Sequence, residues 1–389
     1  MTSGELLSAA ITACIRNGKA LLKFISANDV GKTGSHQYGV YIPKGAASLL
    51  TPHPANRGEN NDHEVKIVWQ GIHDEVTESC IKWYGKAKSE YRLTRFQKGF
   101  KWLNKESVGS LLVIVPLSMT NFEAFVLDHD EEIDEICAAL GVEFVDVWAV
   151  YDSKKPVDFE QNCLGREMSE IVGQIDNFPD TSELSSLARK IALKCIEGWD
   201  KLNPDKELMK AIEIEYSLFK QIEWHICASD VKGPFSSIDK FIEVAATIMN
   251  RRKARAGRSL ENHFDELLTR YSIPHSMRAH VDGQPDILIP GVREYMDADY
   301  PESKLTMIAL KTTCKDRWRQ VLQEANRIDR KHLVTLQNGI SDKQVTKMTD
   351  SGVILVVPKK HHTMFSSRSR KMILTVEGFI EDLRQKYVV

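Results

Sequence analysis

The stretch KLTMIALKTTCKDRWRQVLQEANRID (304–329) decides the fold of the C-terminal half of this chain. Residues 304–311 form an apolar run of strand length, and residues 316–329 show the apolar period of a helix. Three further strand candidates surround the stretch: PDILIP (285–290), HLVTLQ (332–337) and GVILVVP (352–358). Strands that alternate with a helix predict an α/β core built on a mixed sheet.

Helical periodicity dominates the chain between about residue 205 and this core. Three segments carry an amphipathic helical pattern: AIEIEYSLFKQIEWHI (211–226), SIDKFIEVAATIMNRR (237–252) and SLENHFDELLTRY (259–271). Nearer the N-terminus, SELSSLARKIALKCIEGWDKL (182–202) is a predicted helix with Ser182 as its N-cap. The polar segment DNFPDTS (176–182) contains a proline and is predicted to be a linker.

Short strands dominate the first half of the chain. The candidates are GVYIP (39–43), VKIVWQ (65–70), SLLVIVPL (110–117) and FEAFVL (122–127). HPANRGENNDH (53–63) has almost no apolar residue and is predicted to be a loop, whereas EEIDEICAAL (131–140) is predicted to be a helix. This half is therefore expected to be a small β-barrel or sandwich, so the 389 residues divide into two domains.

The composition excludes several classes of protein. Hydrophobic residues make up 42% and charged residues 27%, as in an ordinary soluble globular protein. The seven cysteines are scattered without a CxxC pair, which predicts reduced thiols rather than a disulfide framework or a thiolate zinc site. No run of ~18 apolar residues could span a bilayer, and no signal-peptide pattern is present, so a cytoplasmic location is expected. Because the formal net charge is only −2, nucleic-acid binding would depend on local clusters.

Two strand ends predict a phosphodiester-hydrolysing site. Asp286 begins one strand candidate and Lys311 ends the next, so pairing of these strands can bring a carboxylate and an ammonium to one phosphate. This is the layout of the PD-(D/E)xK nuclease core. Ala309, however, stands where that motif usually carries an acid, so the strict motif fails.

A second acid can come from elsewhere in the chain. Glu324 lies thirteen residues after Lys311 on the predicted 316–329 helix, on one face with Arg317 and Gln320. Glu261, in RSLENHF, is a further candidate. Each of these residues alone is more often a solvated or structural charge. The prediction therefore depends on the set.

Several motifs resemble those of a known family. KTTCKDRWRQVLQEANRI (311–328) resembles the signature segment of the EcoRII-like restriction endonucleases, and NRRKARAGRSLENHFDELL (250–268) and PDILIP (285–290) resemble its neighbouring segments. SANDVGKTGSHQYGVYIP (26–43) and KSEYRLTRF (88–96) resemble the N-terminal effector domain of the two-domain members. The resemblance thus spans nearly the whole chain.

This resemblance implies a domain organisation. Residues 1–165 are expected to form an α+β effector DNA-binding domain with a B3-like β-pseudobarrel. Residues 166–204 are expected to be a linker and connecting helix. Residues 205–389 are expected to form an α/β catalytic domain of the PD-(D/E)xK restriction-endonuclease type.

The resemblance also implies catalytic roles. Asp286, Glu324 and Glu261 become ligands of Mg²⁺, with Glu261 as the supporting acid, and Lys311 becomes the lysine beside the phosphate. Ala309 is then expected, because the family takes its second acid from the helix that follows the lysine strand.

DNA contacts in the nuclease half follow from the same resemblance. Lys315, Asp316 and Arg317 are expected to read C·G pairs, since cations donate to guanine and a carboxylate accepts from cytosine. Asn250 matches a base-contacting position. The cations expected to contact phosphates are Arg251, Arg252, Lys253, Arg255 and Arg258.

Base flipping is a further property of the family. Tyr216 matches the aromatic residue on which the central base stacks. Ile212 replaces the arginine expected one helical turn earlier, so Tyr216 could equally be a core tyrosine.

The effector domain is expected to read DNA through two arms. The expected contacts are His36, Lys86, Lys88, Glu90, Arg92 and Arg95, with Gly31 and Gly34 serving turn geometry. In such enzymes the effector domain blocks the nuclease until it binds a second copy of the site, and Tyr295 matches a position on the blocked surface.

These features predict a type IIE-like restriction endonuclease that cuts CCWGG or a CCNGG-related site, most simply as a homodimer. Two alternatives stay open. One is a non-cleaving B3-like regulator of transcription with a decayed nuclease half. The other is a repair nuclease or resolvase with the same core, for which the Lys315–Arg317 triplet would have little use.

Overall fold

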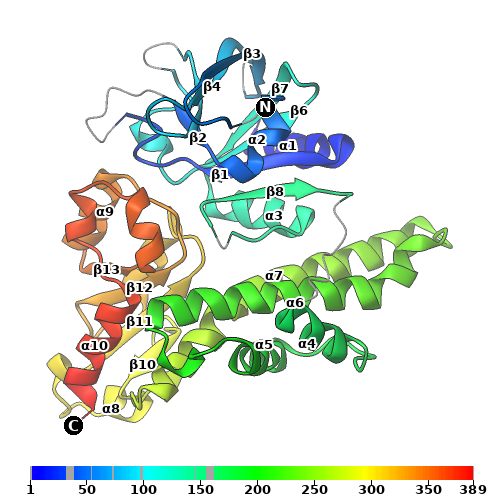
Figure 1. Cartoon of the computed structure of the whole chain (residues 1–389). Helices are drawn as coiled ribbons and strands as arrows, with labels where there is room; N and C mark the ends of the chain where they lie inside the picture. Colours follow the sequence, from blue (N-terminus) through cyan, green and yellow to red (C-terminus); the bar gives the residue numbers. More distant parts are fainter. Residues whose placement is uncertain are drawn as a thin grey trace. The chain divides into compact units, whose positions relative to one another are not determined.

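The computed structural model describes residues 2–31, 39–53, 55–71, 74–96, 100–144, 146–154 and 162–388. The chain divides into two compact units, both visible in Figure 1. Unit 1 comprises residues 1–154, 337–347 and 361–371, and unit 2 comprises residues 155–336, 348–360 and 372–389. Within the described residues, no helix combines the length and the apolarity that a membrane crossing needs.

Unit 1 is built on an eight-stranded sheet in the order β2-β5-β4-β3-β7-β6-β1-β8. All its neighbouring strands are antiparallel except β3 and β7, which are parallel. The elements are α1 (Ser3–Asn17), β1 (Lys19–Phe24), β2 (Val40–Ile42), α2 (Lys44–Leu50), β3 (Asn60–Trp69), β4 (Glu75–Tyr84), β5 (Tyr91–Thr94), β6 (Leu111–Pro116), β7 (Asn121–Leu127), α3 (Asp130–Leu140) and β8 (Trp148–Asp152).

Along the central strands, successive side chains point to opposite faces of this sheet, and a hydrophobic core covers each face. On β1, Leu21 packs into one core with the aromatic residues Trp69 and Trp83. The next residue, Leu22, packs into a second core on the opposite face, under α1 and α3. The resulting α+β unit agrees with the expected pseudobarrel.

The four strands predicted in this half are confirmed, as is the helix predicted at 131–140. The loop predicted at 53–63 is wrong at its C-terminal end, because β3 already begins at Asn60. Asn60 pairs with Tyr84 at the far end of a long antiparallel ribbon, where polar side chains can face water on a paired backbone. The sequence interpretation missed α1, β1, α2, β4, β5 and β8.

Unit 2 contains a helical bundle and a five-stranded sheet in the order β13-β12-β11-β10-β9. The bundle consists of α4 (Cys163–Val172), α5 (Thr181–Cys195), α6 (Pro204–Lys232) and α7 (Ile238–Arg270). The later elements of the chain are β9 (Ser276–Met277), β10 (Ile287–Ile289), α8 (Val292–Met296), β11 (Thr306–Lys311), β12 (Lys331–Thr335), α9 (Asp342–Asp350), β13 (Val353–Val356) and α10 (Val376–Tyr387).

Short 3-10 helices connect these elements. They are η1 (Lys105–Ser107), η2 (Trp199–Lys201), η3 (Glu302–Lys304), η4 (Arg317–Gln323), η5 (Lys359–Met364) and η6 (Ser369–Lys371). In the sheet of unit 2, β11, β12 and β13 run parallel, whereas β10 is antiparallel to both β9 and β11. The predicted mixed sheet and its four strands are therefore confirmed.

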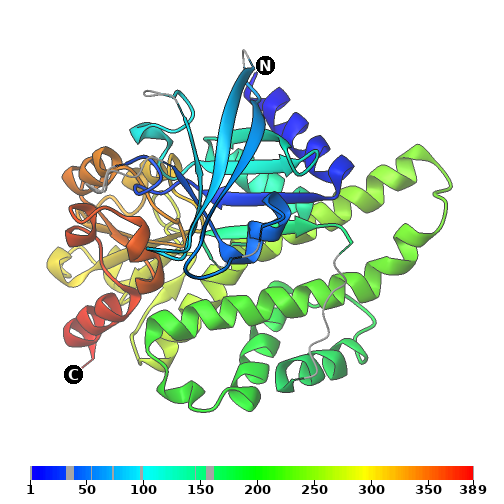
Figure 2. The ribbon, with the colours of Figure 1, turned by 45° about the horizontal axis from the view of Figure 1, so that its top comes forward.

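Two predicted helices form a single long one. The segments 237–252 and 259–271 belong to the continuous helix α7, which Figure 2 shows running the length of the bundle beside α6. The intervening residues 253–258 are mostly Arg, Lys and Ala, which are good helix formers, and Gly257 among them does not break the helix. The N-cap of α5 is Asp180 rather than Ser182, because the Asp180 carboxylate accepts from the main-chain N–H of Glu183.

The helix predicted at 316–329 is wrong, since only the 3-10 helix η4 forms there. A continued helix would bond the N–H of Ala325 to the carbonyl of Val321, but this N–H donates instead to the carbonyl of Asp282 at 2.9 Å. Ala325 also takes a positive φ of 46°. The contact with Asp282, which is distant in the sequence, therefore ends the helical segment after η4.

The prediction that all cysteines are reduced is also wrong, because Cys163 and Cys195 form a disulfide with 5.5 Å between their Cα atoms. Cys163 begins α4 and Cys195 ends α5, and 32 residues separate them in sequence. The packing of α4 on α5 brings the two together, which cysteine spacing alone does not reveal. The other five cysteines form no disulfide within the described residues.

Candidate functional site

The first two predicted site residues meet at the edge of the β10–β11 pair. Asp286 directly precedes β10 and Lys311 is the last residue of β11. The Nζ of Lys311 lies 3.0 Å from Oδ2 of Asp286, and the main-chain N–H of Leu310 donates to the same oxygen at 2.7 Å. The pairing of adjacent strands thus juxtaposes the carboxylate and the ammonium, as the strand assignment predicts.

Glu324 lies beside this pair. Its side chain is 8% exposed, and its Oε2 accepts no hydrogen bond from the described residues. Burial raises the pKa of Glu324 to about 7, and the negative charge of Asp286 also raises it, whereas Lys311 lowers it. The three residues therefore share one electrostatic environment, although Glu324 follows a 3-10 helix and not the predicted α-helix.

Lys331, the first residue of β12, holds the main chain around Glu324 in place. The buried Nζ of Lys331 donates to the main-chain carbonyl of Glu324 and lies 3.5 Å from that of Ala325. Burial lowers the pKa of Lys331, and the charge of Glu324 acts in the opposite direction. Sequence reasoning missed this lysine, because a charged residue before a strand ordinarily indicates a solvated terminus.

Glu261 is linked to Asp286 by hydrogen bonds through Arg278. Its Oε2 accepts from Nη1 of Arg258 at 2.7 Å and from Nε of Arg278 at 2.9 Å. The main-chain N–H of Arg278 donates in turn to the main-chain carbonyl of Asp286 at 2.6 Å. Arg278, which sequence reasoning did not single out, therefore connects α7 to the start of β10.

The donor set suits a hard divalent cation. Asp286 and Glu324 offer carboxylate oxygens, one of them buried and without a protein donor, and such oxygens are the ligands that Mg²⁺ prefers. The residues that the structure describes contain no group of three or more His, Cys, Asp or Glu side chains positioned together for a metal. Glu261, held by two arginines, is not part of a preformed cluster.

The predicted base-reading triplet begins the segment that ends at Glu324. Lys315 is buried, Asp316 is the N-cap residue of η4, and Arg317 is its first residue. Asp316 and Arg317 are half-buried. The triplet is therefore attached to the same short helix that leads to the candidate metal ligand.

The predicted phosphate-contacting run on α7 does not form a uniform cationic face. Lys253 and Asn250 are exposed, but Arg252 makes a bidentate ion pair with Glu223 at 2.7 and 2.8 Å. The guanidinium of Arg251 lies over the ring of Phe178, with 4.9 Å to the centroid.

Arg255 is the most buried member of the run. Its guanidinium lies 5.4 Å from the ring centroid of Tyr216, and its Nη1 lies 3.5 Å from Oε1 of Glu215. Tyr216 is half-buried, and Ile212, at the position where an arginine was expected, is buried. The structure thus supplies an arginine at the Tyr216 ring from α7 rather than from α6.

The expected effector arms are only partly described. His36 and Gly34 lie outside the described residues, whereas Gly31 has the positive φ of 72° expected for a turn. Lys86 and Lys88 are exposed in the turn after β4.

The remaining arm residues lie on or beside β5. Arg92 is buried and contacts Oε1 of Glu90 at 2.8 Å and the carbonyl of Gly39 at 3.2 Å. Arg95 is exposed and pairs with Glu64 at 2.8 Å. Arg92 therefore ties the second arm to the end of the first, whereas Arg95 stays at the surface.

Tyr295, the predicted residue of the blocked surface, is buried in unit 2. Its hydroxyl donates to Oδ1 of Asp282 at 2.7 Å, and Arg327 lies over its ring at 5.6 Å. Burial and the neighbouring Asp282 carboxylate raise the pKa of Tyr295 to about 12.

A mixed sheet joined to a helical bundle, with Asp286 and Lys311 at the ends of two paired strands, is typical of a nuclease of the PD-(D/E)xK class, here preceded by a β-pseudobarrel unit. Comparison with known proteins identifies the family. A family model described as EcoRII C terminal matches residues 219–380, and one described as restriction endonuclease EcoRII, N-terminal, matches residues 16–154.

Two curated restriction enzymes are similar in sequence. The type II restriction enzyme EcoRII of Escherichia coli is 31% identical over 398 residues, covering 94% of each chain. The type II restriction enzyme SsoII of Shigella sonnei is 23% identical over 151 residues, covering 36% of this chain and 48% of that enzyme. The chain therefore belongs to the EcoRII family of type II restriction enzymes.

Solved structures show a weaker likeness. The restriction endonuclease PspGI in complex with substrate DNA matches with a TM-score of 0.46 and 17% identity, over 54% of this chain and 93% of that one. Metal-depleted Ecl18kI in complex with uncleaved, modified DNA matches with a TM-score of 0.43 and 18% identity, over 58% of this chain and 84% of that one.

Proposed function

We propose that this protein is a type IIE-like restriction endonuclease that uses Mg²⁺ to hydrolyse DNA phosphodiesters at a short G·C-rich site. CCWGG is the first expectation and a CCNGG-related site the second, from the similarity to EcoRII along 94% of the chain. The observation that carries the proposal is the 3.0 Å contact between Lys311 and Asp286, with the buried carboxylate of Glu324 beside it. Its DNA substrate would place the enzyme in the cytoplasm.

In this proposal Asp286 and Glu324 hold the cation and Glu261 supports it. When bound, Mg²⁺ would polarise the phosphate and lower the pKa of a bound water. Lys311 places its ammonium beside the phosphate, oriented by its contact with Asp286. Because the pKa of Glu324 is raised to about 7, Mg²⁺ would compete with a proton for this carboxylate near neutral pH.

Sequence readout is assigned to the segment that continues from the catalytic lysine. Lys315, Asp316 and Arg317 would read C·G pairs, with Asn250 as a further base contact. Tyr216 would stack on a flipped base. Phosphate contacts are assigned to Arg251, Arg252, Lys253 and Arg255.

Regulation is assigned to the effector domain, taken as residues 1–165, with 166–204 connecting it to the catalytic residues 205–389. We propose that a second site, bound through His36, Lys86, Lys88, Glu90, Arg92 and Arg95, relieves a block on the nuclease that involves Tyr295. Gln337 and Asn338, which belong to the proposed catalytic residues, donate within unit 1 to the carbonyls of Gly109 and Asp146 at 3.2 and 3.3 Å, so this part of the catalytic range packs with the proposed effector residues.

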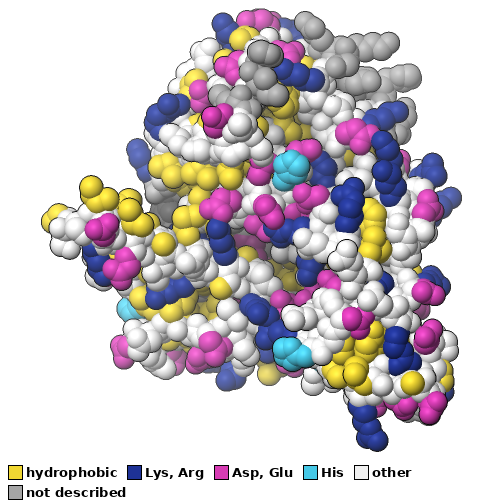
Figure 3. Space-filling view, turned by 180° about the vertical axis from the view of Figure 1, so that it is seen from behind, with side chains coloured by type: hydrophobic (Ala, Val, Ile, Leu, Met, Phe, Trp, Pro, Cys, Tyr) yellow, Lys and Arg dark blue, Asp and Glu magenta, His cyan; other side chains and the backbone are white. Residues whose placement is uncertain are grey.

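A homodimer would provide the two active sites that cleavage of both strands needs. The tip of the α6–α7 hairpin, which projects at the left of Figure 3, carries hydrophobic side chains and offers a surface for a second copy. Between 50% and 79% of each of these side chains is exposed: Trp224, Val231, Ile238, Phe241 and Ile242.

The test is cleavage of a sequenced plasmid with and without Mg²⁺, followed by mapping of the ends. We expect defined ends at CCWGG sites, only when the metal is present. Binding without cleavage would support the non-cleaving regulator, and cutting at branches or mismatches would support the repair nuclease.

A further inference from the structure

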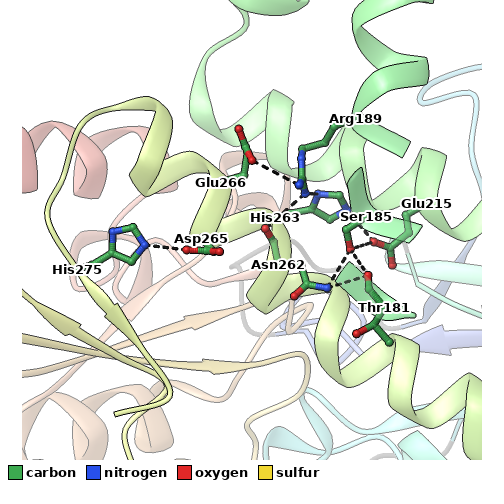
Figure 4. Close-up of polar contacts among 9 residues, drawn as sticks. All are labelled: Thr181, Ser185, Arg189, Glu215, Asn262, His263, Asp265, Glu266 and His275. Atoms are coloured by element: carbon green, nitrogen blue, oxygen red, sulfur yellow. Dashed lines mark hydrogen bonds and ion pairs between the residues drawn. The ribbon is translucent and has the colours of Figure 1, made fainter. Parts of the chain in front are cut away.

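A buried polar cluster lies where α5, α6 and α7 pack together in the helical bundle (Figure 4). At its centre is Glu215 of α6, whose side chain is 1% exposed. The Nε2 of His263 on α7 lies 3.0 Å from Oε2 of Glu215, and the hydroxyl of Ser185 on α5 donates to the same oxygen. Three helices thus converge on one carboxylate.

A second set of hydrogen bonds closes the cluster on the α5 side. The Nδ2 of Asn262 donates to the hydroxyl of Ser185 at 3.1 Å and to the carbonyl of Thr181 at 2.9 Å. The hydroxyl of Ser185 also lies 2.9 Å from that carbonyl. Asn262 precedes His263 on α7, so consecutive residues attach this helix to both of its neighbours.

The His263 ring contacts one side chain on each of the two neighbouring helices. Nη1 of Arg189 lies 3.3 Å from Nδ1 of His263, and Nη2 of Arg189 pairs with Glu266 at 3.4 Å. Because a guanidinium only donates, Nδ1 accepts from Arg189, whereas Nε2 lies on the side of the ring toward Glu215, 3.0 Å from its Oε2. The His263 ring therefore lies between Arg189 on α5 and Glu215 on α6.

The carboxylate at the centre is charged. Burial acts to raise the pKa of Glu215, but the contacts with His263, Arg255 and Ser185 outweigh it, and the pKa lies below its ordinary value. A buried charge is tolerated only when its partners are in place. The cluster therefore strongly favours the one packing of α5, α6 and α7 that supplies all of them.

This packing determines where α7 presents Glu261. Residues two positions apart on an α-helix point in directions about 200° apart. His263 and Glu261 therefore lie on nearly opposite faces of α7. His263 faces the bundle, whereas Glu261 faces Arg278, whose N–H donates to the carbonyl of Asp286. We infer that Glu215 and His263 are positioning residues of the nuclease: their buried contact fixes α7 so that Glu261 and Arg278 hold Asp286 in its catalytic position.

This inference rests on the proposed function, and its test uses the full-length enzyme. Glu215→Gln and His263→Gln remove the charge or the ring, and Glu213→Gln is the matched control, because Glu213 lies on the same helix, is 46% exposed and pairs only with Lys210 among the described residues. Single-turnover cleavage of a duplex with one CCAGG site is measured with Mg²⁺, and Kd is measured by anisotropy with Ca²⁺. Circular dichroism gives the temperature below which each variant is folded.

We expect Glu215→Gln and His263→Gln each to lower the cleavage rate constant at least about tenfold, since small misplacements of catalytic groups are costly. Kd should stay within about threefold, Glu213→Gln should match the wild type, and the double variant should be no slower than the slower single variant. A purely structural cluster would lower only the unfolding temperature.

A folded Glu215→Gln enzyme that cleaves at the wild-type rate overturns the inference while leaving the proposed function intact. If Glu215→Gln does not fold, Ser185→Ala removes one hydrogen bond from the same carboxylate and is expected to slow cleavage severalfold at unchanged Kd. A wild-type rate for Ser185→Ala then overturns the inference. If the wild-type enzyme itself does not cut, the proposed function fails and this inference fails with it.

Discussion

The hydroxyl of Tyr295 donates to Oδ1 of Asp282 at 2.7 Å, from a ring that is buried in unit 2. The other carboxylate oxygen of Asp282 accepts from the N–H of Asn326 at 2.6 Å, and its main-chain carbonyl accepts from the N–H of Ala325 at 2.9 Å. Because these residues directly follow Glu324, the turn at Asp282 sets the backbone that carries the proposed metal ligand.

Asp282→Ala should therefore loosen the Glu324 segment. It removes both carboxylate acceptors of this exposed residue, so we expect a loss of on the order of 1–2 kcal/mol in the free energy of unfolding and a slower cleavage step. Tyr295→Phe removes one of these bonds and should cost about 1 kcal/mol. Urea unfolding and single-turnover cleavage measure the two effects, and an unchanged cleavage rate in folded Asp282→Ala would contradict this role.

Lys311→Ala and Asp286→Ala should each abolish detectable cleavage and leave DNA binding largely intact. Each removes a charge that the proposed mechanism places at the phosphate or the cation, a loss that ordinarily costs at least about a hundredfold in rate. Lys304→Ala, at an exposed lysine just before β11, is the matched control. A gel assay with Mg²⁺ and a binding assay without it decide the outcome, and wild-type cleavage by either variant would exclude the assigned site.

The sequence predicts the Asp286–Lys311 contact because it arises from two adjacent strands, whose ends meet whenever the strands pair. It predicts the proximity of Glu324 but through the wrong element, since the turn at Asp282 that ends η4 is a contact across more than forty residues. Glu215 and His263 escape prediction for a similar reason. In a helical pattern each is a polar residue of an amphipathic segment, and only the packing of three helices shows that they are buried together.

Acid should destabilise unit 2 through His332. Burial, with the charges of Arg330 and Lys386, lowers the pKa of this ring to about 4, and the ring stacks on Phe379 with 4.6 Å between centroids. The unfolded chain takes up the proton first, near pH 6.5, so stability is lost as the pH falls from there toward 4.

The expected loss between pH 7 and pH 5 is about 2 kcal/mol from this group alone. Urea unfolding at the two pH values measures it. His332→Phe, which keeps an aromatic ring against Phe379 but does not titrate, should remove that part of the pH dependence. An identical pH dependence in the variant would show that other groups are responsible.

Reduction should weaken the helical bundle. The Cys163–Cys195 disulfide closes a segment of 32 residues between α4 and α5, and a crosslink of this span stabilises by roughly 4 kcal/mol through the unfolded chain. Cys163→Ser, or reductant added to the wild type, should therefore lower the unfolding temperature. If reductant has no effect on the wild type and iodoacetamide labels both thiols without it, the two cysteines are not paired in solution.

Removal of the effector domain should raise the rate on DNA that carries a single site, if that domain blocks the nuclease. The shortened chain should begin at residue 162, because α4 packs in the helical core and Cys163 is its first residue. A start near residue 180 would remove both. With either start, residues 337–347 and 361–371 are separated from the rest of unit 1. The shortened chain is therefore expected to unfold at a lower temperature than the full chain, and cleavage must be measured below that temperature.

Plasmids with one and two CCWGG sites provide the comparison: the full-length enzyme should prefer two sites and the shortened one should cut both alike. Equal rates of the two proteins on the one-site plasmid would mean that the effector domain exerts no block, and the contacts of Gln337 and Asn338 in unit 1 would then be only structural.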